Sequence, residues 1–95
     1  MLRREGNVLL VEGPVTLATV PELVSAVEEH FSNGAGVVDF AGVTDIDSSA
    51  VALALEWVRK AERAGVPLRL LNIPSSMQNL ARLYGVSELL HSTSA

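Results

Sequence analysis

Hydrophobic residues recur along this chain with two different periods, and each period predicts a different kind of element. Short apolar runs bounded by glycine or proline predict strands at 7–12 (NVLLVE), 36–40 (GVVDF) and 67–71 (PLRLL). Apolar positions spaced three or four residues apart predict helices at about 19–33, 48–64 and 75–84. Strands that alternate with helices favour a mostly parallel sheet with helices packed on it, and a hairpin at the N-terminus would add a further strand.

Local signals mark where these helices begin and end. Thr19 with Glu22, and Ser75 with Gln78, have the spacing of a capping box at a helix start. Gly65 is expected to end the middle helix, because glycine tolerates the left-handed conformation that follows a helix. The run 36–40 is strongly apolar, so we expect it to be a buried central strand.

The middle helix carries two apolar stripes, although a single buried face needs only one. The stripe expected to face the sheet consists of Val51, Ala54, Leu55, Val58 and Ala61. The second stripe lies well around the helix and consists of Ala50, Leu53 and Trp57. Either a neighbouring helix covers Trp57, or this stripe is an exposed apolar surface with an aromatic anchor, which is typical of an interface.

The residues at the N-terminus of this helix, Asp47-Ser48-Ser49, can be interpreted in several ways. Each of these side chains could accept hydrogen bonds from the free N–H groups of the first turn and so cap the helix. A helix N-terminus also tolerates a phosphate, so Ser48 and Ser49 are candidate phosphorylation sites. Phosphate there would add negative charge beside Asp45 and Asp47 and would repel a docked partner. Nucleophilic catalysis by either serine would require a base that only tertiary contact could supply.

Composition narrows the possible functions. The chain has 95 residues, enough for one domain, with 48% hydrophobic and 19% charged residues, so we expect it to be globular. A net charge of −4 argues against nucleic acid or an anionic membrane as the main partner. The absence of cysteine excludes disulfides and thiolate chemistry. No apolar run reaches the roughly 20 residues that span a bilayer, so we expect a cytoplasmic protein without direct membrane insertion.

The sequence offers few groups for catalysis or for holding a cofactor. His30 and His91 have no ligand-like neighbours in sequence, so we expect exposed histidines and no metal site. The glycines at 34 and 36 lack the context of a phosphate-binding loop. We therefore expect no enzyme activity and no cofactor. Activity as a hydrolase would require His30 or His91 to approach the serines.

The segment GVVDFAGVTDIDSSAVALAL resembles the signature of STAS domains, a family that includes anti-sigma-factor antagonists and sulfate-transporter tails. In that pattern a buried strand with an acid precedes Asp-Ser/Thr-Ser/Thr/Gly-Gly-Leu at a helix start. Asp47, Ser48 and Ser49 match it, whereas Ala50 and Val51 replace the usual glycine and leucine. The resemblance implies a single α/β STAS domain over 1–95, with a small mixed, mostly parallel sheet of about four to five strands flanked by helices. We expect 92–95 to be disordered.

Two branches of the family fit this chain. The aliphatic run AVALALEWV and the segment NLARLYGVSELL resemble the small STAS subunit of the Mla transporter, an ABC transporter that moves phospholipids between the membranes of Gram-negative envelopes. This resemblance implies a non-catalytic cytosolic subunit that binds the ATPase subunit and lies at the inner membrane through it. The predicted contact residues are Asp47, Ser48, Ser49, Ala50, Leu53 and Trp57. The alternative is an anti-sigma-factor antagonist switched by phosphorylation of Ser48 or Ser49.

Overall fold

The computed structural model describes residues 1–91 of the 95-residue chain, so the predicted disorder of 92–95 lies outside the described part. A four-stranded sheet has the order β1-β2-β3-β4. Its strands are β1 (Leu2–Glu5), β2 (Val8–Val15), β3 (Val37–Ile46) and β4 (Arg69–Leu71). β1 pairs antiparallel with β2, whereas β2–β3 and β3–β4 pair parallel. The predicted mixed, mostly parallel sheet is therefore confirmed, and the N-terminal hairpin is present.

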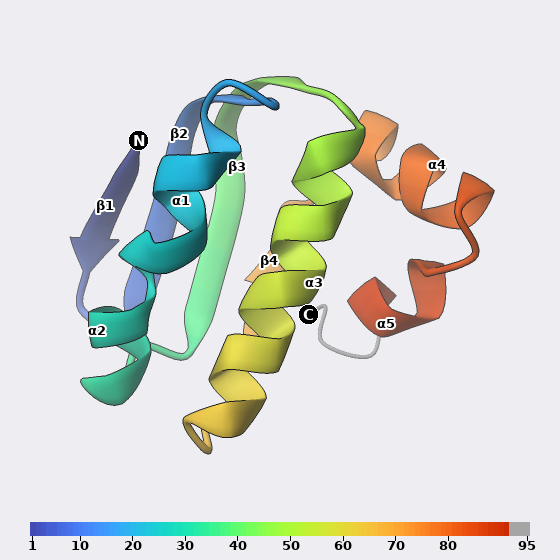
Figure 1. Cartoon of the computed structure of the whole chain (residues 1–95). Helices are drawn as coiled ribbons and strands as arrows, with labels where there is room; N and C mark the ends of the chain where they lie inside the picture. The colour runs from blue at the N-terminus through green and yellow to red at the C-terminus, as the bar shows by residue number, and fades with distance from the viewer. Residues whose placement is uncertain (92–95) are drawn as a thin grey trace.

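The helices gather on one side of this sheet. They are α1 (Val20–Ala26), α2 (Glu28–Ser32), α3 (Ser48–Arg63), α4 (Ser75–Leu83) and α5 (Ser87–His91). α1, α2 and α3 lie over one face of the sheet, and α4 and α5 pack against α3 (Figure 1). No helix within residues 1–91 is long and apolar enough to cross a membrane.

The hydrophobic core fills the layer between the sheet and the helices. The strands contribute alternate residues to it, namely Leu9, Val11, Val15, Val38, Phe40 and Leu70. α3 contributes Ala50, Val51, Leu53, Ala54, Trp57, Val58 and Ala61. Leu90 is 1% exposed, so the segment after α4 also packs into the core. The wide buried arc of α3 explains why its sequence is apolar on two stripes.

The first predicted helix is interrupted at Val27, which separates α1 from α2. In an unbroken helix the Val27 N–H would donate to the Leu23 carbonyl. Here the indole Nε1–H of Trp57 donates to that carbonyl at 3.0 Å, and the Val27 N–H donates to the Ser25 carbonyl. The Trp57 side chain from α3 thus takes the carbonyl whose hydrogen bond would join α1 to α2 in one helix.

Neither predicted capping box forms its side-chain hydrogen bond. Thr19 is the N-cap of α1, but it has a helical backbone conformation, and its hydroxyl accepts from the Thr16 N–H at 3.0 Å. At α4 the N-cap is Pro74, and the Gln78 amide donates to the Ile73 carbonyl at 2.9 Å. At the end of α3, Gly65 has φ +73°, and its N–H donates to the Glu62 carbonyl, as the sequence predicts.

The central strand β3 is longer and less covered than expected. It runs six residues past the predicted end at Phe40, to Ile46, because Gly42, Val43 and Ile46 pair with β2. Its buried residues are Val38 and Phe40, whereas Val37 is half-buried on the opposite face. The predicted buried central strand is confirmed in its position between β2 and β4 and in the burial of Val38 and Phe40, but the described helices cover only one of its faces.

Candidate functional site

The turn from β3 into α3 is held by the carboxylate of Asp47, the N-cap of the helix. The backbone of Asp47 is extended, with φ −130° and ψ −172°, which aims its side chain back over the first turn. Its Oδ1 accepts from the Ser49 N–H at 2.9 Å and also from the Ser49 hydroxyl. The cap predicted from sequence is present, and Asp47 is the residue that makes it.

The same carboxylate also holds a second loop. Oδ2 of Asp47 accepts from the N–H of Leu17 at 2.9 Å, in the loop between β2 and α1. The hydrogen bond from the Ser49 hydroxyl, followed by the one from the Leu17 N–H, lowers the pKa of Asp47 below its ordinary value. Asp47 is therefore ionised at neutral pH and joins two loops that are distant in sequence.

The two serines of the motif have different surroundings. Ser48 is exposed at the first position of α3, and its hydroxyl makes no hydrogen bond with any described residue. Ser49 is half-buried, and its hydroxyl is committed to Asp47. The structure thus leaves Ser48 as the accessible hydroxyl, a distinction that the sequence pattern does not make.

The second stripe of α3 is covered within the domain, so the prediction that it forms a contact surface is wrong. Trp57 is 0% exposed, Ala50 and Leu53 are each 1% exposed, and none of these side chains can meet a partner without unfolding. The Trp57 ring stacks on Phe40 of β3 with centroids 6.3 Å apart. The large aromatic therefore faces the sheet and α1, where its ring stacks on Phe40 and its N–H donates to the Leu23 carbonyl.

A different apolar surface lies beside Ser48. A shallow depression of about 300 Å³ is lined by Ser48, Val51, Ala52, Leu55, Tyr84 and Val86. Tyr84 is 54% exposed, and its neighbour Leu83 is 75% exposed. Leu17, fixed to Asp47 through its N–H, is also 75% exposed. We call Ser48, Ala52, Leu55, Tyr84 and Leu17 the motif surface.

Sequence reasoning missed most of the motif surface. Helical spacing predicts that Leu55 faces the sheet, but this residue is only half-buried and lines the depression. Ala52 and Leu55 follow Ser48 by four and seven residues, the spacing of one helical face, so the sequence does contain this signal. Tyr84 and Leu17 reach this side only through the tertiary fold.

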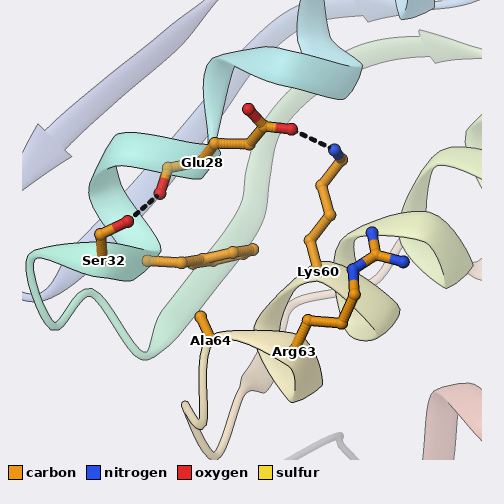
Figure 2. Close-up of a pocket in the computed structure, with 6 residues that line it drawn as sticks. Glu28, Ser32, Lys60, Arg63 and Ala64 are labelled. Carbon is orange, nitrogen blue, oxygen red and sulfur yellow. Dashed lines mark hydrogen bonds and ion pairs between the residues drawn. The ribbon is translucent and has the colours of Figure 1, made fainter.

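A second hollow lies far along α3 from the motif. It measures about 240 Å³ and is lined by Glu28, Phe31, Ser32, Lys60, Arg63 and Ala64. Figure 2 shows the Lys60 ammonium bonded to the Glu28 carboxylate across it. This ion pair lowers the pKa of Glu28 through the hydrogen bond from Lys60 and the positive charge. Lys60 is paired with Glu28, and Arg63, the second cation of the lining, is paired with Glu56 at 3.4 Å, so each cation already has a carboxylate partner.

The geometry gives no support to nucleophilic catalysis by the serines. His30 lies in α2, and its carbonyl accepts from the Ala35 N–H just before the start of β3, whereas Ser48 lies two residues beyond the end of β3. His30 is half-buried rather than exposed, with Nδ1 3.4 Å from the Arg4 guanidinium. The side chain of His91 lies outside the described part. No group of three His, Cys, Asp or Glu within residues 1–91 could hold a metal ion.

Comparisons with known proteins place this architecture in a family. A search of curated proteins finds no match. Among solved structures, the chain is similar to the anti-sigma factor antagonist SpoIIAA in its unphosphorylated form, with a TM-score of 0.70 and 19% identity. That similarity covers 100% of this chain and 84% of SpoIIAA, and it shows the fold. The family model described as "Mlab, STAS domain" matches residues 1–91. Together with the capped Asp47-Ser48-Ser49 helix mouth, this match shows that the chain belongs to the MlaB-type STAS domain family.

Proposed function

We propose that this protein is a non-catalytic cytosolic subunit of an ABC transporter that maintains the lipid asymmetry of the outer membrane. It would bind the ATPase subunit through the motif surface and regulate it. The membership in the MlaB-type STAS family supports this assignment, as does the resemblance of 79–90 to that branch. Attachment to the inner membrane would then come through the ATPase and its permease.

The observation that carries the proposal is the composition of the motif surface. An exposed hydroxyl at Ser48 stands next to apolar Ala52 and Leu55, with Tyr84 at the edge of the depression. Clustered exposed apolar groups with an aromatic residue are typical of protein interfaces, where tyrosine adds contact area and a polar end. Ser48 would contribute the polar contact at the centre.

The physical mechanism requires no chemistry from this chain. The Ser49 hydroxyl donates to the Asp47 carboxylate, which is a weak base because its pKa is lowered, and His30 lies at the other end of β3, away from both serines. A subunit of this kind changes ATP hydrolysis by binding one conformation of the ATPase more tightly than another. Asp47 would support binding by fixing the helix start and Leu17 together, without touching the partner through its hydrogen-bonded oxygens.

The test is a charge placed at the centre of the motif surface. Ser48→Glu would leave an unpaired carboxylate in the interface, which costs about 2–5 kcal/mol and should weaken ATPase binding roughly 30-fold or more. Ser25→Glu is the matched control, because Ser25 is an exposed helical serine on α1, outside the motif surface. Binding of each purified variant to the cognate ATPase is measured by titration calorimetry, and folding by circular dichroism.

The expected result is loss of binding for Ser48→Glu alone, with both variants folded. Wild-type affinity for Ser48→Glu would refute the assigned surface. A tagged pull-down from the native cell tests the partner itself, and recovery of an ABC ATPase with its permease is the supporting outcome. Recovery of a serine kinase or a sigma-factor regulator instead would overturn the transporter assignment.

The second candidate is a phosphorylation switch, as in an anti-sigma-factor antagonist. The exposed Ser48 at the start of α3 favours it, since a phosphate there would lie at the positive end of the helix dipole. The solved neighbour SpoIIAA is named as an anti-sigma factor antagonist in its unphosphorylated form. Phosphate on Ser49 would instead replace its bond to Asp47 with repulsion between two anions.

Mass spectrometry of the protein isolated from its native cell distinguishes the two candidates. A stoichiometric phosphoserine at Ser48 or Ser49 that disappears when a cognate kinase is deleted would establish the switch. An unmodified protein that co-purifies with the ATPase would reject it.

A further inference from the structure

Asp39 of β3 carries a half-buried carboxylate that belongs neither to the hydrophobic core nor to the motif surface. Its Oδ1 accepts from the N–H of Ala41 at 2.8 Å and from the side-chain amide of Asn72 at 3.0 Å. Ala41 lies further along the same strand, whereas Asn72 directly follows β4. One carboxylate oxygen therefore joins two segments that are distant in sequence.

The first of these hydrogen bonds lies at a bulge in β3. The pair Leu10–Asp39 is followed by the pair Glu12–Gly42, which is two residues further along β2 but three further along β3. Ala41 has no partner in this register, and its N–H donates to Asp39 instead. A bulge bends its strand and changes the direction of the residues that follow. The bend thus sets the course of the second half of β3, which leads into the start of α3 and the motif surface.

The second hydrogen bond lies where the chain leaves the sheet for α4. The pairing of β3 with β4 ends at Asp39 and Leu71, and Asn72 follows with φ +56°. Among residues 1–91, Asn72 is the only non-glycine residue with a positive φ, a conformation that asparagine tolerates better than most residues. Its amide donates to Asp39 and so holds this turn, and α4 begins three residues later at Ser75.

The core alone holds α4 along a narrow line. The buried residues of this helix are Met77 and Ala81, which lie one turn apart on the same side. Contact along one line restrains the rotation of a helix about its own axis weakly, so the segments at its two ends matter. The first end is held through Asn72, and the last carries Tyr84, which lines the depression beside Ser48. A rotation of α4 would therefore move Tyr84 relative to Ser48.

We propose that Asp39 is a positioning residue of the motif surface, which sets the placement of Tyr84 relative to Ser48. It holds the bend of β3 on one side and the start of α4 on the other, and a carboxylate oxygen suits this task because it accepts from two donors at once. Asp39 alternates with the buried Val38 and Phe40, so it projects to the face opposite the helices and acts without touching a partner. This inference rests on the proposed function for the use of the motif surface in docking.

Three substitutions separate the two hydrogen bonds from the charge. Asp39→Asn keeps a side-chain oxygen that can accept from both donors, so it is the matched control. Asp39→Leu removes the acceptor and places an apolar side chain beside Leu10 and Leu71, its partners in the register, so the fold is expected to survive. Asn72→Gly removes the donor but keeps the positive φ, which glycine adopts readily, so it releases α4 and leaves the bond to Ala41 in place.

Residual dipolar couplings measured by NMR give the orientation of α4 relative to α3 in each variant, and circular dichroism verifies folding. Asp39→Asn is expected to keep the wild-type orientation, whereas Asp39→Leu and Asn72→Gly change it. Only Asp39→Leu should also shift the amide signals of 43–48. A wild-type orientation in a folded Asp39→Leu or Asn72→Gly variant overturns the proposal, as does a changed orientation in Asp39→Asn. If Asp39→Leu does not fold, Asn72→Gly decides.

Binding to the cognate ATPase, measured by titration calorimetry, connects this geometry to function. Asp39→Leu should bind about 3–10-fold more weakly than the wild type, because the docking surface is no longer preorganised, and Asp39→Asn should restore the affinity. Wild-type affinity of a variant whose α4 has changed orientation overturns the role in docking. So does an affinity that only follows the free energy of unfolding across the variants. A wild-type chain that binds no ATPase refutes the proposed function instead, and the orientation of α4 then still decides whether Asp39 positions Tyr84.

Discussion

Trp57 provides the sharpest test of how this domain is held together. Its indole is fully buried, stacks on Phe40, and donates to the Leu23 carbonyl at the point where α1 is interrupted. Trp57→Phe keeps an aromatic ring in place but removes the N–H donor. The Leu23 carbonyl lies in the last turn of α1, where carbonyl groups have no N–H partner within the helix.

The expected loss of stability depends on whether another N–H donates to the Leu23 carbonyl in the variant. An acceptor left unsatisfied in the core costs about 1–3 kcal/mol, and the smaller ring adds a cavity term. The lower value applies if the Val27 N–H takes over the Leu23 carbonyl and joins α1 to α2. A domain of this size has about 5–15 kcal/mol of stability, and each kcal/mol lowers the melting temperature by roughly 4–8 °C. We therefore expect a fall of roughly 5–20 °C.

The assay is chemical denaturation for the free energy of unfolding and thermal denaturation for the melting temperature. Both are followed by far-ultraviolet circular dichroism, because Trp57 is the only tryptophan and its fluorescence is lost in the variant. Phe40→Leu is the control: it removes the ring stack, worth about 0.5–1.5 kcal/mol beyond area, and leaves the hydrogen bond. A Trp57→Phe variant within about 0.5 kcal/mol of wild type would refute the role assigned to the indole N–H. Loss of ATPase binding by a folded Trp57→Phe would refute its assignment as a core residue.

Further predictions concern the motif and the sheet. Because hydrogen bonds lower the pKa of Asp47, its ionised form stabilises the fold above the ordinary pKa near 4, and this stability is lost as pH falls through the lower folded value. Asp47→Asn should therefore unfold more readily at pH 7 and show a flatter stability profile between about pH 5 and 2 in acid titrations. Ser49→Ala removes the largest cause of the shift, so the carboxyl carbon of Asp47 should titrate at higher pH by NMR; an unmoved titration would contradict the assignment. Gly42→Val should lower the free energy of unfolding by about 1–3 kcal/mol in urea denaturation, because a Cβ there would lie 3.1 Å from the Val11 carbonyl and from Glu12 Cγ. Wild-type stability of this variant would show that β2 and β3 move apart easily.

The sequence alone determined which kind of domain this is. Apolar periodicity located β2, the first half of β3, β4, α3 and α4, whereas it joined α1 to α2 and did not predict α5. Gly65 and Asp47 marked the two ends of α3. These features are local, because propensity, capping and turn chemistry depend on neighbours in the chain. The motif at 45–51 also indicated the family, and the family model matches residues 1–91.

Only the tertiary structure decided which faces are buried. Both stripes of α3 are apolar enough to form a surface, but contact with α1 and the sheet covers Trp57, because its ring and its N–H both find partners there. The mostly exposed second half of β3 forms a strand because β2 supplies its hydrogen-bond partners. Leu17 and Tyr84 come near Ser48 from loops and helix ends that no local pattern connects. Burial depends on contacts between residues distant in sequence, so periodicity can predict an apolar face without identifying what covers it.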